Sequence, residues 1–213
     1  MKNCKIYLIR HGQSLGNLNR LYLGHTNLDL SEEGYRQAEI TADFLKDVDF
    51  DLIYSSDLLR AHNTAVPHAK MRNLDIIDSI ELREIYLGDW ENKEIEYLIE
   101  NHYNDFVIGW KDNFGTFTVP GGESVIGAGK RFFNKVSEIA KLNMGKTVLI
   151  TAHAAVIRVF WALISNVKPE NIATEVQFPT NASYSIIEFD EEKFIPGEYS
   201  CDSHFNSKPI QTV

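Results

Sequence analysis

Two arginines and two histidines stand where short apolar runs of the chain end. Arg10 and His11 directly follow the apolar run in "IYLIRHGQS", and His153 follows "VLITA". A further arginine, Arg60, lies a few residues beyond "DLIY". Arginine binds a phosphoryl group through paired hydrogen bonds, and a neutral imidazole is a competent nucleophile. If the fold brings these four residues together, they predict a site for phosphoryl transfer.

His11 is the candidate nucleophile of this set. An imidazole has a reference pKa of about 6.5, so most of it is neutral at pH 7. Phosphoryl transfer needs alignment and neutralisation of charge, and a cluster of cations supplies both. An acid must still protonate the leaving alcohol. The stretch "ELREIYLGDWEN" contains carboxylates that could fill this role, and Glu81 and Glu84 are the candidates considered.

The apolar runs that carry these residues are expected to be strands that alternate with helices. We expect a strand in "KIYLIRHG" and a second strand in "FDLIYSS" that passes into a helix near Ser55 to Asp57. A third strand is expected from Thr147 to Thr151, before an apolar helix. This alternation favours a parallel sheet covered on both faces. The predicted fold is therefore α/β, with three layers around a mostly parallel sheet.

Two further segments complete this prediction. "LSEEGYRQAEITADFLKDV" predicts a helix with Ser31 as its N-cap and with Tyr35, Ala38, Ala42 and Leu45 on one apolar face. "ASYSIIEFDEEKFIPGEYS" predicts two strands joined by an acidic turn at one edge of the sheet.

The expected sheet also predicts where the four charged residues meet. In a parallel α/β sheet, ligands bind outside the carboxyl ends of the strands. Arg10, His11, Arg60 and His153 all fall at that end of their strands. Helices that begin there add free N–H groups and the positive end of the helix dipole, which favour an anion.

The region from Ile85 to Ser124 departs from the alternation and ends in "PGGES". Its aromatic residues are Tyr86, Trp90, Tyr97, Tyr103, Phe106, Trp110, Phe114 and Phe117. We expect a partly helical lid over one end of the sheet, so that residues 1–213 form a single domain. Alternatively, these aromatic residues fill core beneath long loops.

Composition limits the expected partners. The 213 residues have a formal net charge of -9, which leaves no global basic surface for nucleic acid or acidic lipid. No apolar run approaches the length of a membrane span, and Cys4 and Cys201 form no C-x-x-C pattern. We therefore expect a cytoplasmic protein with no nucleic-acid or membrane partner. The oligomeric state cannot be inferred from these features.

The remaining histidines separate into two groups. His62, His68, His102 and His204 show no spacing typical of metal ligands. We therefore expect no metal and no cofactor. His25 follows Gly24 in a loop predicted to flank the site, and both residues are candidates for substrate contact.

Six stretches of the chain resemble, in order, the motifs of a known family. They are "LIRHGQSLGN", "LDLSEEGYRQA", "IYSSDLLRAHNTA", "LREIYLGDWEN", "PGGES" and "TAHAAVIR", which lie between Ile6 and about Arg158. Together they resemble the histidine phosphatase superfamily, with its phosphoglycerate mutase-like fold. "LREIYLGDWEN" and "PGGES" are similar to phosphatases of the α-ribazole-phosphate and broad-specificity types.

The resemblance implies a role for each matching residue. His11 corresponds to the phosphorylated histidine, His153 to the second histidine, and Glu84, at the end of "LRE", to the acid/base glutamate. The implied phosphate-binding groups are the side chains of Arg10, Asn17 and Arg60 and the backbone N–H of Ala154. The resemblance also implies a phosphohistidine intermediate that water hydrolyses without a metal.

The chain departs from the family pattern at a few positions. Ala154 and Ala155 stand where the family usually has two small glycines. Alanine changes little there unless the backbone requires a positive φ. "WEN" replaces the more usual "WEG", and Leu23 stands where mutase members carry a hydroxyl residue. The last two changes concern specificity more than phosphoryl chemistry.

The leading hypothesis is a metal-independent phosphatase that acts on a small phosphomonoester. A phosphoglycerate mutase is the alternative among enzymes, but residues 85–124 contain no arginine to hold a second anionic group. A catalytically inactive binding module is a third hypothesis. It predicts loss of an arginine, a histidine or the glutamate, and all are present. Specificity is expected to lie in the lid, with Trp110 and Phe114 as the residues to test.

Overall fold

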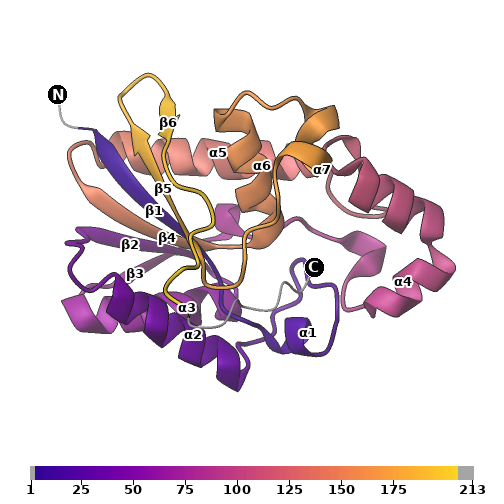
Figure 1. The fold of residues 1–213 in the computed structure, drawn as a ribbon, viewed down its shortest axis with the longest axis horizontal. Coiled ribbons are helices and arrows are strands. Elements are labelled where there is room, and N and C mark those ends of the chain that lie inside the picture. Colours follow the sequence, from indigo (N-terminus) through magenta and orange to yellow (C-terminus); the bar gives the residue numbers. More distant parts are fainter. Residues whose placement is uncertain (1–2, 206–213) are drawn as a thin grey trace.

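The computed structural model describes residues 3–205, which form a six-stranded sheet between two layers of helices (Figure 1). The strand order is β3-β2-β4-β1-β5-β6. Strands β1, β2, β3 and β4 pair in parallel, whereas β5 pairs antiparallel with both β1 and β6. The strands are β1 Cys4–Arg10, β2 Leu52–Ser56, β3 Ile76–Ser79, β4 Thr147–Ala152, β5 Tyr184–Phe189 and β6 Phe194–Pro196. The predicted mostly parallel sheet is confirmed, and so are the two further strands at one edge of it; their antiparallel direction was not predicted.

The long helices cover both faces of the sheet, as the alternation predicted (Figure 1). Alternate residues of β1 enter two separate clusters: Ile6 and Leu8 pack with α5 and α6, while Tyr7 and Ile9 pack with α3 and the end of α2. This is the period of two expected for a strand that is buried on both faces. The helices are α1 Leu15–Leu18, α2 Glu32–Phe44, α3 Leu59–Arg72, α4 Ile95–Asn101, α5 Val125–Leu142, α6 Ala154–Ile164 and α7 Ile172–Glu175.

Helix α2 begins after Ser31, whose hydroxyl accepts a hydrogen bond from the Gly34 amide, so the predicted N-cap is confirmed. Ala38 and Ala42 are buried as expected, but Tyr35 is 43% exposed and its assignment to the buried face is wrong. Gly34 takes that buried place, because a Cβ there would lie 2.0 Å from the backbone oxygen of Gln13. Because the two backbones approach closely at Gly34, the side of α2 that carries Gly34 faces the core and Tyr35 lies on the exposed side.

Two predicted boundaries shift by a few residues. The helix expected near Ser55 to Asp57 begins at Leu59, because β2 continues through Ser56, which still pairs with Ser79 of β3. Strand β4 likewise extends one residue beyond Thr151, to Ala152, where it pairs with Arg10.

Residues 85–124, named here the aromatic segment, are partly helical as predicted and lie at one end of the sheet (Figure 1). Besides α4, they contain the 3-10 helices Gly88–Trp90 and Phe114–Thr116 and the π-helix Asn104–Asp112. Trp90, Phe106, Trp110 and Phe114 are buried, whereas Tyr86, Tyr97 and Tyr103 are exposed. Part of the segment is therefore core, as the alternative interpretation proposed, whereas its role as a lid stays a prediction.

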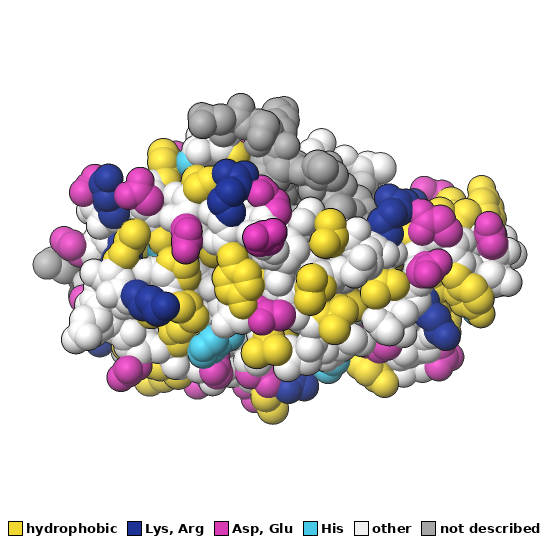
Figure 2. Space-filling view, turned by 90° about the horizontal axis from the view of Figure 1, so that it is seen from below, with side chains coloured by type: hydrophobic (Ala, Val, Ile, Leu, Met, Phe, Trp, Pro, Cys, Tyr) yellow, Lys and Arg dark blue, Asp and Glu magenta, His cyan; other side chains and the backbone are white. Residues whose placement is uncertain are grey.

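The charged side chains on one face of the molecule are of both signs (Figure 2). Acidic and basic side chains lie interspersed on the face drawn in Figure 2. Within residues 3–205, no helix combines the length and apolar character needed to cross a membrane.

Candidate active site

The register of two neighbouring strands brings His11 and His153 together. Arg10 pairs with Ala152 at the ends of the parallel strands β1 and β4. The residues that directly follow these two strands are His11 and His153, and their ring centroids lie 5.2 Å apart at an interplanar angle of 60°. Both imidazoles are buried at the carboxyl end of the sheet, where the sequence predicted the site.

A single hydrogen bond fixes the tautomer of His11. Its Nδ1 lies 2.7 Å from the carbonyl oxygen of Gly12. Because a carbonyl can only accept, Nδ1 carries the proton and Nε2 keeps its lone pair. Burial, and then the positive charges of Arg60 and Arg10, hold the pKa of His11 well below its usual range. The imidazole is therefore neutral at physiological pH.

The two arginines are buried beside this imidazole and line one cavity with it. Backbone carbonyls orient them: Arg60 donates to Gly24 and Thr26, each at 2.8 Å, and Arg10 donates to Pro179 at 2.6 Å. Burial lowers the pKa of each guanidinium to about 10, so both remain charged at pH 7. Two cations beside a neutral imidazole can bind a phosphoryl group.

Glu91, a residue that the sequence analysis did not single out, holds the loop that orients Arg60. Its carboxylate accepts hydrogen bonds from the backbone amides of His25 at 2.7 Å and Thr26 at 2.9 Å, and from the Thr26 hydroxyl. Burial opposes ionisation of Glu91, but the bonds from Thr26 and the backbone amides outweigh it and lower its pKa. The position of Glu91 in the motif stretch "GDWEN" could have marked it as a functional candidate, but its contact with residues 24–26 cannot be read from the sequence.

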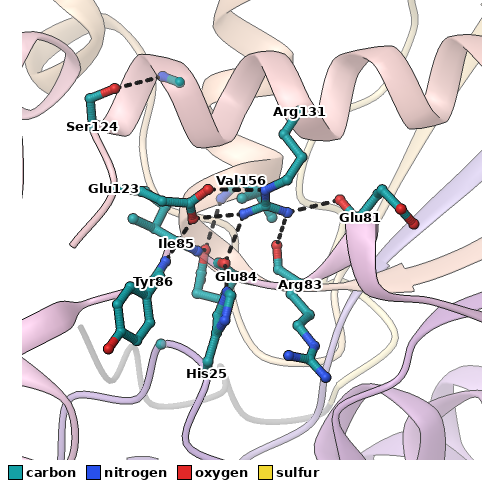
Figure 3. A network of polar contacts seen from close by, with 12 residues as sticks. His25, Glu81, Arg83, Glu84, Ile85, Tyr86, Glu123, Ser124, Arg131 and Val156 are labelled. Carbon is teal, nitrogen blue, oxygen red and sulfur yellow. Dashed lines mark hydrogen bonds and ion pairs between the residues drawn. The ribbon is translucent and has the colours of Figure 1, made fainter.

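Gly24 and His25, the candidates for substrate contact, do not line the cavity. The Gly24 carbonyl is occupied by Arg60. His25 lies with Nε2 2.9 Å from the Glu84 carbonyl and with its ring 5.2 Å from that of Tyr86 (Figure 3). Both residues therefore support Arg60 and Glu84 here, and their contact with substrate stays a prediction.

Glu84 is buried and lines the cavity, whereas Glu81 is exposed and does not. The carboxylate of Glu84 lies at the N-terminus of α6 (Figure 3), where Oε1 accepts from the amides of Ile85 and Val156 and Oε2 from that of Ala155. The three distances lie between 2.9 and 3.1 Å. Of the two carboxylates left open by the residue types, Glu84 is the one that can reach a substrate.

The remaining predicted residues surround the same place. Asn17 and Ala154 line the cavity, and the Glu84 carboxylate occupies the amides of Ala155 and Val156 but not that of Ala154. Ala154 and Ala155 are not among the described residues with a positive φ, so alanine fits this backbone without strain. His153 lies behind His11, with Nε2 2.8 Å from the hydroxyl of Ser56.

The cavity has an empty volume of about 590 Å³, part of it open to solvent. Besides the polar residues described above, its lining contains six apolar or aromatic side chains, named here the apolar wall: Leu21, Tyr22, Leu23, Leu87, Trp110 and Phe178. Phe114, predicted with Trp110 as a lid contact, is instead buried beneath the wall, 4.9 Å from the Trp110 ring. Phe178 lies outside every sequence motif, and nothing in the sequence marks it as a wall residue.

Comparison with known proteins agrees with this arrangement. The family model described as "Histidine phosphatase superfamily (branch 1)" matches residues 6–201. The chain belongs to the histidine phosphatase superfamily.

Relatives within the histidine phosphatase superfamily differ in activity. Phosphoserine phosphatase 1 of Hydrogenobacter thermophilus is 31% identical over 190 residues, 89% of this chain and 88% of that protein. A 2,3-bisphosphoglycerate-dependent phosphoglycerate mutase of Cytophaga hutchinsonii is 29% identical over 172 residues, 79% of this chain and 80% of that protein. The solved structure of Bacillus stearothermophilus YhfR has a TM-score of 0.88 at 28% identity and covers 94% of this chain and 98% of its own.

Metal-ligating side chains do not gather in the described part of this superfamily member. Residues 3–205 contain no group of three or more His, Cys, Asp or Glu side chains that could hold a metal ion. The positive charge next to His11 comes from Arg10, Arg60 and the N-terminus of α6.

Proposed function

We propose that the protein is a phosphatase that hydrolyses small phosphomonoesters through a phosphohistidine on Nε2 of His11. The observation that carries this proposal is the 2.7 Å contact between Nδ1 of His11 and the Gly12 carbonyl. It leaves Nε2 as the nucleophilic atom of a residue that lines the same cavity as Arg10 and Arg60. A neutral nucleophile beside fixed cations is what a metal-independent phosphoryl transfer requires.

In the first step, the lone pair of His11 Nε2 attacks phosphorus and the P–O bond to the alcohol breaks. Arg10 and Arg60 offset the charge on the non-bridging oxygens, with further donors from the Asn17 side chain and the Ala154 amide. Glu84, in its protonated form, gives its proton to the leaving oxygen. Its Oε2 suits this role because it accepts one hydrogen bond from the described residues, compared with two at Oε1.

In the second step, a water attacks the phosphohistidine and gives its proton to the Glu84 carboxylate. The P–N bond breaks, phosphate leaves, and His11 returns to the neutral form. The proposed role of His153 in binding the phosphoryl group rests on the family resemblance and on its ring lying 5.2 Å from that of His11, because His153 itself is buried and does not line the cavity. Each proton that Glu84 donates in the first step is replaced in the second, so no metal or other cofactor is needed.

The alcohol part of the substrate is proposed to lie against the apolar wall. Tyr22 and Trp110 offer rigid rings at this wall, with centroids 5.9 Å apart. Aromatic side chains bind apolar and ring-bearing groups over a large area. An apolar wall discriminates weakly, by about 1–3 kcal/mol per methylene group, so we expect several phosphomonoesters to react.

The cavity offers less support to a mutase. A phosphoglycerate mutase must hold a carboxylate and a second phosphate in addition to the transferred group. Among the described residues, Arg10 and Arg60 are the only lysine or arginine side chains that line the cavity. An inactive binding module has no specific observation in its favour, because His11, Arg60, Glu84 and the other predicted groups are all present. We further propose that residues 1–213 form one domain that acts on small molecules in the cytoplasm.

A panel of phosphomonoesters tests the proposed function. We expect release of inorganic phosphate from aryl and alkyl phosphates in the presence of excess EDTA, with ring-bearing esters preferred over 3-phosphoglycerate. The same panel should be measured with 2,3-bisphosphoglycerate as primer. Mutase activity that exceeded every rate of hydrolysis would contradict the proposal, and so would a loss of activity in EDTA that one divalent ion restores.

Trp110→Ala should change the ranking of substrates while leaving the phosphorylation of His11 intact. We expect kcat/KM to fall about tenfold for ring-bearing esters relative to a small alkyl phosphate, because only the larger groups reach this wall. Trp161→Ala is the matched control, since Trp161 lies on α6 and does not line the cavity. Equal losses on all esters in the Trp110 variant would show that this ring is structural core.

A further inference from the structure

Arg131 of α5 does not line the cavity, yet all five of its N–H donors are used next to Glu84 (Figure 3). Its Nη1 donates to the backbone carbonyls of Glu81 at 2.9 Å and Arg83 at 3.0 Å. Its Nη2 donates to the carbonyl of Glu84 at 3.0 Å. The other contacts are to the Glu123 carboxylate, from Nε at 3.1 Å and from Nη2 at 2.9 Å. Five donors thus meet five acceptors.

The three carbonyls converge because a helical turn ends there. The 3-10 helix Ile80–Leu82 stops just before Arg83, and the carbonyls at the end of a helix lack partners within it. Arginine presents five donors in a planar fork, whereas lysine presents three from one point. Only an arginine can therefore bind the three carbonyls and a carboxylate at the same time.

Glu123 extends this contact to the other side of Glu84. Its Oε2 accepts a hydrogen bond from the Tyr86 amide at 2.8 Å, and its own amide donates to the Tyr86 carbonyl at 2.9 Å. Burial opposes ionisation of Glu123, but the bonds from Arg131 and the Tyr86 amide lower its pKa. Ser124 caps the N-terminus of α5 directly afterwards, by accepting from the Gly127 amide. In the stretch "GES", Glu123 thus holds the chain that follows Glu84, and Ser124 caps the start of α5.

Arg131 of α5 thus holds the backbone at and before Glu84, and Glu123, which lies just before α5, holds the backbone after it. The Glu84 carboxylate meanwhile accepts hydrogen bonds at the N-terminus of α6. Glu84 is held between two helices that pack against each other. The Arg131–Glu123 pair is only partly buried, with side-chain exposures of 24% and 31%. A partly exposed ion pair contributes little to the stability of the fold. Its larger effect should be on the position of Glu84.

We propose that Arg131 and Glu123 are positioning residues for Glu84 and set the rate at which it protonates the leaving group. This inference rests on the proposed function, in which Glu84 is that acid. A displacement of about 1 Å in a catalytic group can cost about 100-fold in rate. The loss should appear only in reactions that need the acid, because neither residue touches the phosphoryl group.

Single-turnover rates of Arg131→Lys on two esters test the inference. With an alkyl phosphate, whose alkoxide is a poor leaving group, we expect the rate to fall about 10- to 100-fold. With p-nitrophenyl phosphate, whose phenolate leaves unaided, we expect a change of less than about threefold. Arg36→Lys is the matched control, because Arg36 makes the same bidentate pair with Glu33 on the surface of α2. It should change neither rate.

Two further variants keep the inference falsifiable. Glu123→Gln removes the charge that holds Arg131 and should give a smaller loss with the same dependence on the leaving group. In a Glu84→Gln background, Arg131→Lys should cost nothing more, since the acid is already absent.

Equal losses on both esters, or an added loss in the Glu84→Gln background, would overturn the positioning role alone. If Glu84→Gln by itself affected both esters equally, the assignment of the acid would fall, and the positioning role with it.

Discussion

His11→Ala should abolish turnover of every phosphomonoester while the protein stays folded. No other described residue presents a neutral nucleophilic nitrogen to the cavity, since His153 lies behind His11 and Nε2 of His11 carries the free lone pair. We expect a loss of about 10⁴- to 10⁶-fold in kcat, the range seen when a covalent nucleophile is removed. Phosphate release under saturating substrate measures this loss.

The matched control is His62→Ala, because His62 lies on α3, pairs with Asp78 and does not line the cavity. Both variants should unfold on heating at a midpoint temperature close to that of the wild type. If His11→Ala still hydrolysed phosphomonoesters at a substantial rate, and this activity co-purified with the protein, then water or another side chain would attack phosphorus directly.

Glu84→Gln should slow the reaction in proportion to how poorly the alcohol leaves. General acid catalysis contributes about 10²- to 10⁴-fold, and most of it is needed when the leaving alkoxide is strongly basic. We expect a loss in this range for an alkyl phosphate. With p-nitrophenyl phosphate, the first turnover should proceed within severalfold of the wild-type rate. Later turnovers should be slow, because the same carboxylate activates the attacking water.

A burst of p-nitrophenolate is therefore the signature of the Glu84 variant. Glu81→Gln is the control, because Glu81 lies three residues away, is exposed and does not line the cavity. It should behave as the wild type on both esters. Equal first-turnover losses on alkyl and aryl phosphates in Glu84→Gln would show that Glu84 is not the acid of the leaving group.

The sequence predicted which residues meet at the centre of the candidate site because strand ends are local features. Arg10, His11 and His153 each follow an apolar run directly, so a parallel register was enough to bring them to one edge of the sheet. The cap at Ser31 was readable for the same reason. Tyr35 was misplaced because the buried side of α2 depends on the approach of Gly34 to Gln13, a contact between distant segments.

The supporting contacts could not be predicted because they depend on packing between segments far apart in sequence. The Glu91 carboxylate accepts hydrogen bonds from the amides of residues 25 and 26, and Arg131 donates hydrogen bonds to backbone carbonyls around residue 83. Glu91 lies in the motif stretch "GDWEN", but the local sequence of neither residue shows which distant segment its side chain contacts. The aromatic segment was ambiguous for a related reason. Its rings at Trp90 and Phe114 are core and its ring at Trp110 lines the cavity, and no regular spacing of the aromatic residues distinguishes the two roles.

The most direct test is the chemical identity of the phosphorylated intermediate. The wild type should be quenched in alkali during turnover of labelled substrate, digested, and its phosphopeptide analysed for position and isomer. The Nδ1 bond to the Gly12 carbonyl leaves only Nε2 of His11 free to attack. We therefore expect an acid-labile, alkali-stable phosphopeptide that contains His11 phosphorylated on Nε2. Phosphate on Nδ1, label on another residue, or an oxygen-linked phosphoester that survives acid would contradict the account.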